Sequence, residues 1–234
     1  MLWDVDHTLL DAGGSGVRVF QRAFSQMFGR PFPAGTMSLA GRTDRAIALE
    51  ILTVAGVSEP RAQLGAFQRR IAGLAPQLAQ LVAEHGRVLP GAGEALAALA
   101  ALEARPVIQS VLTGNMRATA AVKLATLGLD RYLDLAVGAY GDDHEIRADL
   151  VPAARDNAAA AHGADFAGTA TVLVGDTPLD IEAARLTGAR AVGVATGGFS
   201  PAELAAAGAD AVLPDLTSTA QVVAAITDGV VPPD

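Results

Sequence analysis

Short apolar runs alternate with helix-like patterns along most of this chain, and this alternation restricts its fold more than any other feature. Such an alternation is typical of βαβ units, which build a mostly parallel sheet covered by helices on both faces. We therefore predict a doubly wound α/β fold. Its strands are expected at residues 2–5, 107–112, 135–139, 171–174, 191–195 and 211–213.

The long interval between the first two predicted strands shows no strand pattern and is predicted to be a helical insertion. Apolar residues there recur at spacings of three and four, which predicts helices with one buried face. They are Phe20, Ala23, Phe24, Met27 and Phe28, and then Leu64, Phe67, Ile71, Leu74, Leu78 and Leu81. Glycines flank the interval and can absorb backbone rotation. We predict a movable helical cap domain over residues 13–88 and an α/β core domain over residues 1–12 and 89–234.

Composition excludes several classes of protein. The 234 residues are 51% hydrophobic and 18% charged, which indicates a globular chain. No apolar stretch is long enough for a membrane span, and Asp4 and Asp6 stand where a signal peptide would be basic. The net charge of −8 without a basic stripe argues against nucleic-acid binding. Because cysteine is absent, we expect a cytoplasmic protein. We expect it to be a monomer or a homodimer.

Acidic side chains follow two of the predicted strands. Asp4 and Asp6 come after the first strand, and Asp176 and Asp180 after the strand at 171–174. Open α/β sheets bind ligands at the carboxyl ends of their strands. Carboxylates that meet there repel one another unless a cation neutralises them, and a set of oxygen ligands favours Mg²⁺. Asp180 equally suits the capping of the helix that follows.

Thr113, Gly114 and Asn115 follow the predicted strand at 107–112 and precede a helix. A hydroxyl and turn amides at a helix start can bind an anion, although an ordinary N-cap has the same pattern. Combined with the carboxylates, this turn predicts a site for a metal-bound phosphoryl group.

These motifs resemble those of the haloacid dehalogenase superfamily hydrolases, in the branch with a helical cap after the first motif, and particularly the phosphoglycolate phosphatase-like members. The family's first motif, Asp-x-Asp-x-Thr, stands here as Asp4-Val5-Asp6-His7-Thr8, and its second motif as Thr113. Its fourth motif stands as Gly175-Asp176-Thr177-Pro178-Leu179-Asp180.

The resemblance implies a Mg²⁺-dependent phosphomonoesterase that acts on a small phosphorylated metabolite. Asp4 would attack phosphorus and become an aspartyl phosphate, while Asp6 would protonate the leaving oxygen and then activate water. Asp4, the Asp6 backbone carbonyl and Asp176 would hold the metal, with Asp180 as a further ligand or orienting a bound water.

Thr113, with Gly114 and Asn115, would bind the phosphoryl oxygens. Phosphoglycolate, sugar phosphates and nucleoside monophosphates all fit this class. A phosphosugar mutase of the same fold and a phospholigand-binding protein without turnover remain as alternatives.

Some positions depart from the family pattern. The third motif is usually a lysine, but Lys123 lies directly after the Thr113 turn, where we expect a solvated helix charge. Arg147 lies at about the expected place, and we assign it the cationic role beside Asp4. His7 replaces a common glycine and is expected to hydrogen-bond within its loop. Because only three residues precede Asp4, we expect either a natural start upstream or a short first strand.

Arg42 and Thr43 form part of a polar loop inside the apolar insertion, just before a predicted helix. We predict that one of them contacts the leaving group of the substrate. The alternative is that Thr43 or Asp44 caps the helix and that the arginines face solvent.

Overall fold

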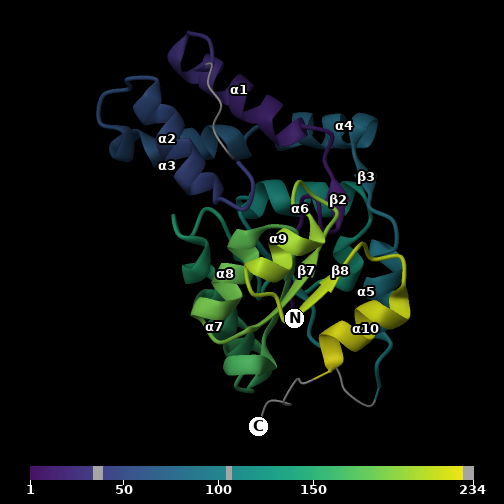
Figure 1. The fold of residues 1–234 in the computed structure, drawn as a ribbon. Coiled ribbons are helices and arrows are strands. Elements are labelled where there is room, and N and C mark those ends of the chain that lie inside the picture. Colours follow the sequence, from purple (N-terminus) through teal and green to yellow (C-terminus); the bar gives the residue numbers. More distant parts are fainter. Residues whose placement is uncertain (34–38, 104–106, 229–234) are drawn as a thin grey trace.

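A parallel sheet forms the centre of the molecule in the computed structural model, which describes residues 1–33, 39–103 and 107–228 (Figure 1). Its strands lie in the order β5-β4-β1-β6-β7-β8, and each neighbouring pair is parallel. They are β1 (Leu2–Trp3), β4 (Ser110–Thr113), β5 (Ala139–Tyr140), β6 (Val172–Gly175), β7 (Arg190–Val194) and β8 (Ala211–Leu213). Each overlaps a predicted apolar run or begins at its end, which confirms the α/β fold.

The predicted strand at 135–139 is wrong for most of its length. Residues 135–137 form a turn and a bend, and a strand begins only at Ala139. The turn is fixed by the carboxylate of Asp134, which accepts a hydrogen bond from the backbone N–H of Ala136 (3.1 Å). An aspartate that bonds the backbone two residues later favours a turn over a strand.

Alternate strand residues point to opposite faces of the sheet, and each face is covered by helices. On one face, Trp3, Val111 and Val174 belong to a buried cluster with residues of α5 (Ala92–Ala100), α6 (Arg117–Thr126) and α10 (Thr219–Thr227). On the other face, Leu2 and Leu173 pack with residues of α7 (Leu150–His162), α8 (Pro178–Leu186) and α9 (Pro201–Ala206). The sheet is therefore doubly wound, as expected for a Rossmann-like core.

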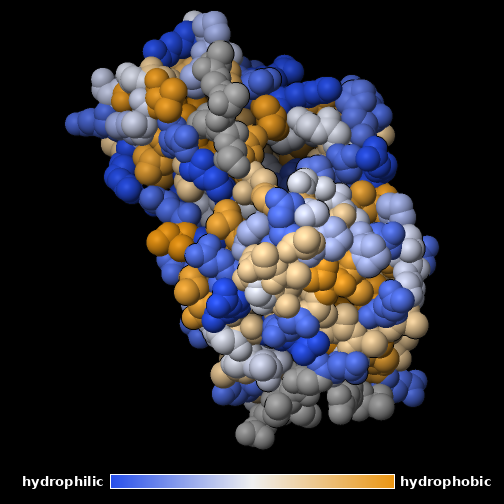
Figure 2. Space-filling view, in the orientation of Figure 1, coloured by the Kyte–Doolittle hydropathy of each residue, from blue (hydrophilic) through white to orange (hydrophobic). Residues whose placement is uncertain are grey.

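The interval predicted to be helical contains α1 (Ser15–Phe28), α2 (Asp44–Val54), α3 (Pro60–Ala72) and α4 (Ala75–His85). Phe67 of α3 meets the rings of Phe20 and Phe24 of α1 edge to face, with ring centroids 6.0 and 6.2 Å apart. These helices lie together beyond the carboxyl ends of the strands (Figure 1). The space-filling view shows the same two-lobed shape, with a hollow where the lobes meet (Figure 2).

The expectation that this interval is free of strands is wrong at its edges. A two-stranded antiparallel ladder pairs β2 (Leu10–Asp11) with β3 (Arg87–Val88) where the chain leaves the core and returns to it. Strands of two residues are too short to show as an apolar run, so pattern alone does not find them. No helix in the described ranges is long and apolar enough to cross a membrane.

Candidate active site

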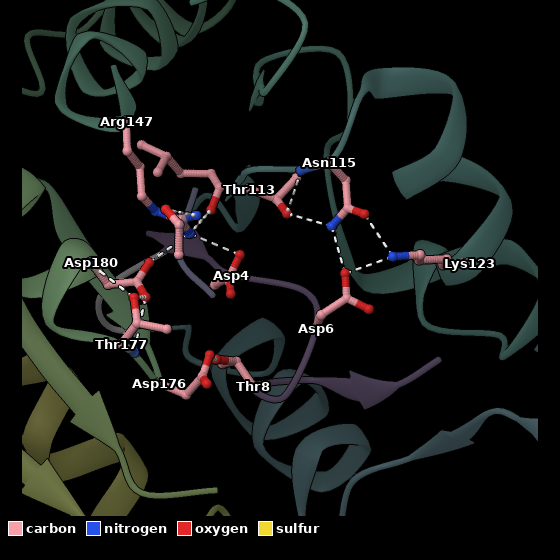
Figure 3. Close-up of polar contacts among 12 residues, drawn as sticks. Asp4, Asp6, Thr8, Thr113, Asn115, Lys123, Arg147, Asp176, Thr177 and Asp180 are labelled. Carbon is pink, nitrogen blue, oxygen red and sulfur yellow. Dashed lines mark hydrogen bonds and ion pairs between the residues drawn. The ribbon is translucent and has the colours of Figure 1, made fainter. Parts of the chain in front are cut away.

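Three neighbouring strands, β4, β1 and β6, end side by side, and a residue at or directly after each strand end lies near one point (Figure 3). Thr113 ends β4, Asp4 follows β1, and Asp176 follows β6. All three are buried, and the backbone N–H of Asp4 is fixed by the carbonyl of Val174 (2.8 Å). Asp4, Asp176 and Asp180 each offer one carboxylate oxygen, and these oxygens lie within 4.8 Å of one another.

Arg147 is the cation among these carboxylates. Its Nη2 lies 2.8 Å from Oδ1 of Asp4 and 2.6 Å from Oδ1 of Asp180. The guanidinium also donates to the carbonyls of Gly41 (3.2 Å) and Leu112 (3.3 Å). Burial disfavours the charge, but Asp180 and Asp4 outweigh it and raise the pKa of Arg147 above its ordinary value. The guanidinium thus stays charged and joins the strand ends to the loop before α2.

Asp180 supports Arg147 and the start of α8. Its Oδ2 accepts hydrogen bonds from the backbone N–H (3.1 Å) and the hydroxyl (2.7 Å) of Thr177, which caps the helix. Its Oδ1 is taken by Arg147. Asp180 thus orients Arg147 and caps α8, and it also belongs to the group of three carboxylates whose oxygens lie within 4.8 Å of one another.

The pKa values of Asp4 and Asp176 show that the site is short of positive charge. Burial raises the pKa of Asp4 to about 6, against the opposing charge of Arg147. Burial, reinforced by the charges of Asp4 and Asp180, raises the pKa of Asp176 to about 8. A bound divalent cation would reverse these shifts, and a set of carboxylate oxygens suits Mg²⁺. The residues present therefore fit such an ion.

Lys123 corrects one expectation. It is not a solvated helix charge: its side chain is buried, and Nζ donates to Oδ2 of Asp6 (2.6 Å) and Oδ1 of Asn115 (2.6 Å). Asn115 Nδ2 in turn donates to Oδ2 of Asp6 (2.7 Å) and to the hydroxyl oxygen of Thr113 (2.8 Å). α6 packs against α4 of the insertion, and Gly16 of α1 lies beside Nζ, so Lys123 stands between the core and the insertion.

Asp6 is held as a carboxylate by this contact. Burial on its own would raise the pKa of Asp6, but the charge of Lys123 and the hydrogen bonds from Lys123 and Asn115 lower it below its ordinary value. A signal for Lys123 exists in the sequence, since it follows Met116, Thr119 and Ala120 at helical spacing on the buried face of α6.

The polar loop before α2 is bound to the core. Thr43 caps α2 by accepting from the backbone N–H of Ala46 (3.2 Å), and its hydroxyl donates to the carbonyl of Glu145 (3.0 Å). Thr43 is therefore the buried N-cap of α2, as one part of the alternative expected, and it is not among the residues that line the pocket. The contact of this loop with a leaving group stays a prediction. Arg42 faces the pocket and forms an ion pair with Glu50 (2.6 Å).

The backbone geometry at Gly114 and at His7 explains which residue types suit these two positions. A side chain at Gly114 would collide with the carbonyl of Arg42, so glycine there lets the insertion loop approach the core. His7 has a left-handed backbone with φ of 60°, which explains why glycine suits this place. The backbone of His7 is tied to its surroundings: its N–H donates to Leu10 (2.7 Å), and its carbonyl accepts from the hydroxyl of Thr196 (2.5 Å).

A pocket of about 610 Å³ opens between these strand ends and the insertion. Asp4, Asp6, Thr113, Lys123 and Asp176 line its catalytic end. The structure thus brings the carboxylates, the Thr113 turn and two cations from separate parts of the sequence to one end of one pocket.

Known proteins share these features. A family model described as haloacid dehalogenase-like hydrolase matches residues 1–185. A phosphoglycolate phosphatase of a Cupriavidus necator plasmid is 30% identical over 221 residues, which cover 92% of this chain and 89% of that protein. A solved hydrolase from Pseudomonas syringae is 25% identical with a TM-score of 0.63, covering 95% of this chain and 96% of that one. A haloacid dehalogenase-like family hydrolase from Streptococcus pneumoniae has 17% identity and a TM-score of 0.60, with 95% of each chain covered.

Proposed function

The chain belongs to the haloacid dehalogenase-like hydrolases, and on that premise we propose that it is a Mg²⁺-dependent phosphomonoesterase that works through an aspartyl phosphate. The observation that carries this proposal is Asp4, a buried carboxylate at a strand end that contacts Arg147, neighbours Asp176 and lines the pocket. The substrate is a small phosphorylated metabolite. Phosphoglycolate, which the name of the Cupriavidus necator relative specifies, is the reference compound for tests.

Asp4 is the nucleophile. Arg147 holds Oδ1 of Asp4, which directs the other carboxylate oxygen toward the pocket. In the first step a bond forms between that oxygen and phosphorus while the bond from phosphorus to the leaving oxygen breaks. Arg147 acts as a positioning residue because it braces Asp4 and keeps its charge at every working pH.

Asp6 moves the protons. Because Lys123 and Asn115 favour its carboxylate form in the free protein, Asp6 must take up a proton from solvent as the substrate binds. It gives that proton to the leaving oxygen in the first step and takes one from the water that attacks the phosphorus in the second. That water releases inorganic phosphate and restores the Asp4 carboxylate. The hydrogen bonds from Lys123 and Asn115 suit the second step, because they favour the carboxylate form of Asp6.

Thr113 is placed to hold the transferring group. Its oxygen accepts from Nδ2 (2.8 Å) and from the backbone N–H (3.3 Å) of Asn115, which leaves its own hydrogen to donate to a phosphoryl oxygen. The backbone of Gly114 stands beside it. These groups support binding of the phosphoryl oxygens at the end of β4.

Asp4, Asp176 and the backbone carbonyl of Asp6 would hold Mg²⁺, with Asp180 as a further ligand or orienting a bound water. When bound, Mg²⁺ supplies the positive charge that neutralises the carboxylates and the phosphoryl oxygens. The raised pKa of Asp176 supports this assignment, since it marks a carboxyl group without enough positive charge around it.

Hydrolysis of p-nitrophenyl phosphate with and without Mg²⁺ tests the proposal. We expect metal-dependent release of p-nitrophenol and inorganic phosphate in equal amounts, and loss of both in Asp4→Asn. Asp156→Asn, an exposed change on α7, is the matched control. Equal rates for Asp4→Asn and the native protein would place the chemistry elsewhere. Release of p-nitrophenol without free phosphate would instead indicate transfer to a second hydroxyl, as in a mutase.

A further inference from the structure

The pocket beside Asp4 continues into the insertion, where its wall is apolar. This part, the apolar chamber, is lined by Val17 and Phe20 of α1, Leu39 before α2, Ile47 and Ile51 of α2, and Leu78 of α4. The phosphoryl end and the chamber are therefore two ends of one cavity, so a substrate whose phosphate meets Asp4 would place its leaving group in the chamber.

Two side chains of the chamber wall remain exposed at its mouth. Val17 and Leu39 are each 38% exposed, whereas Ile47, Ile51 and Leu78 deeper in the wall are buried. Val17 and Leu39 therefore supply accessible apolar surface in a cavity that is continuous with the reactive site, where an apolar part of a ligand can cover them. A ligand in the chamber would therefore gain most of its binding free energy from the burial of apolar surface.

The cations around the pocket already have carboxylate partners. Arg42 pairs with Glu50 (2.6 Å), Lys123 with Asp6 (2.6 Å), and Arg147 with Asp4 and Asp180. To bind a second acidic group, Arg42 would have to share its guanidinium between that group and Glu50, and Lys123 or Arg147 would have to leave a carboxylate partner. For the two buried cations, this would leave a carboxylate in a poorly solvated place without its charge partner, which is costly.

The remaining charged groups do not change this conclusion. Among the described lining residues, His7 stands at the catalytic end directly after Asp6, and Asp11 and Asp44 are acidic. Residues 34–38, outside the described part, contain no charged side chain in the sequence. The pocket is therefore supplied with charge for one anion, the phosphoryl group, and with apolar surface for the rest of the substrate.

We propose that the apolar chamber receives an uncharged, largely apolar leaving group, so that the preferred substrate is the phosphate monoester of a neutral apolar alcohol or phenol. This rests on the proposed phosphatase activity and names the substrate class of the same site. The cavity of about 610 Å³ lies within the size range of sites for ligands far larger than a two-carbon acid phosphate. The substrate thus differs from the one in the name of the Cupriavidus necator relative.

The test compares unbranched alkyl phosphates from ethyl to hexyl with phosphoglycolate. The leaving alcohols have similar acidity, so differences in kcat/KM report binding of the alkyl chain. We expect kcat/KM to rise about fourfold with each added methylene until the chamber is filled. Phosphoglycolate should be a poorer substrate than propyl phosphate, which has a similar size but no carboxylate.

Variants assign the effect to the chamber. Val17→Ser and Leu39→Ser should reduce the dependence on chain length, and both positions are exposed enough to tolerate a polar residue without unfolding. Val54→Ser is the matched control, because Val54 is 61% exposed on α2 and does not line the pocket. It should leave the dependence on chain length unchanged.

The outcomes separate the two proposals. If p-nitrophenyl phosphate is hydrolysed in an Asp4-dependent way but kcat/KM does not rise with chain length, the inference about the chamber is overturned and the phosphatase stands. Preference for phosphoglycolate over propyl phosphate would overturn it in the same way. If the native protein does not hydrolyse p-nitrophenyl phosphate in the presence of Mg²⁺, the proposed function is overturned, and this inference with it.

Discussion

Replacing Arg147 by methionine removes the cation shared by the buried carboxylates, and we expect a large loss of stability. The Arg147 side chain is 5% exposed and lies 2.8 Å from Asp4 and 2.6 Å from Asp180. Removing one partner of a buried ion pair costs about 3–5 kcal/mol. For a chain of this length, each kcal/mol shifts the Tm by about 2–4 °C, so the Tm should fall by about 6–20 °C.

The loss should be larger at pH 8 than at pH 5. Burial raises the pKa of Asp4 to about 6 and that of Asp176 to about 8, above the value of about 3.9 in an unfolded chain. Such a group stabilises the folded state by taking up a proton, and this contribution is lost as the pH rises through the folded pKa. At pH 5, protons therefore replace part of the charge that Arg147→Met removes.

Thermal unfolding in the presence of a chelator, at pH 5 and pH 8, measures this effect without interference from bound metal. Arg87→Met is the matched control, because Arg87 is 68% exposed and pairs with Asp11 at 2.6 Å on the surface. Breaking that pair should cost no more than about 1 kcal/mol. An Arg147→Met protein as stable at pH 8 as the Arg87→Met control would refute the assignment of Arg147 as the buried counter-charge.

Two further predictions concern the metal and Asp6. Mg²⁺ binding at pH 7 should release about one proton, because burial and the charges of Asp4 and Asp180 raise the pKa of Asp176 to about 8 and keep it protonated beforehand. Calorimetry in buffers with different ionisation enthalpies measures this release, and its absence would contradict a role for Asp176 as ligand. Lys123→Met should raise the pKa of Asp6, so the acidic limb of the kcat profile should move to higher pH, whereas Lys123→Arg should keep it near its native position. An unmoved limb in Lys123→Met would show that Lys123 does not control Asp6.

The sheet and the convergence of carboxylates could be predicted because each depends on local sequence. Apolar runs mark buried parallel strands, and an aspartate directly after such a run falls at the sheet's carboxyl edge. Asp4 and Asp176 follow this rule, and β1 and β6 are neighbours in the sheet. Arg147 was placed by its separation from the fourth motif, and the structure puts it beside Asp4.

The contacts that involve the insertion could not be predicted in the same way. The helical spacing places Lys123 on the buried face of α6, but its partner Asp6 lies 117 residues away and does not show in the local pattern. Thr43 is occupied partly by the carbonyl of Glu145, which belongs to a core loop far along the chain. The sequence around a charged or hydroxyl side chain on a helix is the same whether that side chain faces solvent or a distant element. The distant contact, which the local sequence does not reveal, determines its role.

The most direct test of an aspartyl phosphate on Asp4 uses an enzyme that completes the first step and not the second. In Asp6→Asn with p-nitrophenyl phosphate and Mg²⁺, the good leaving group needs no proton, but the water that follows lacks its base. We predict a burst of p-nitrophenol stoichiometric with enzyme, and a phosphoryl group on the peptide containing Asp4 in mass spectra of the quenched reaction. A phosphoryl group on another residue, or steady hydrolysis at the native rate with none on Asp4, would contradict the account.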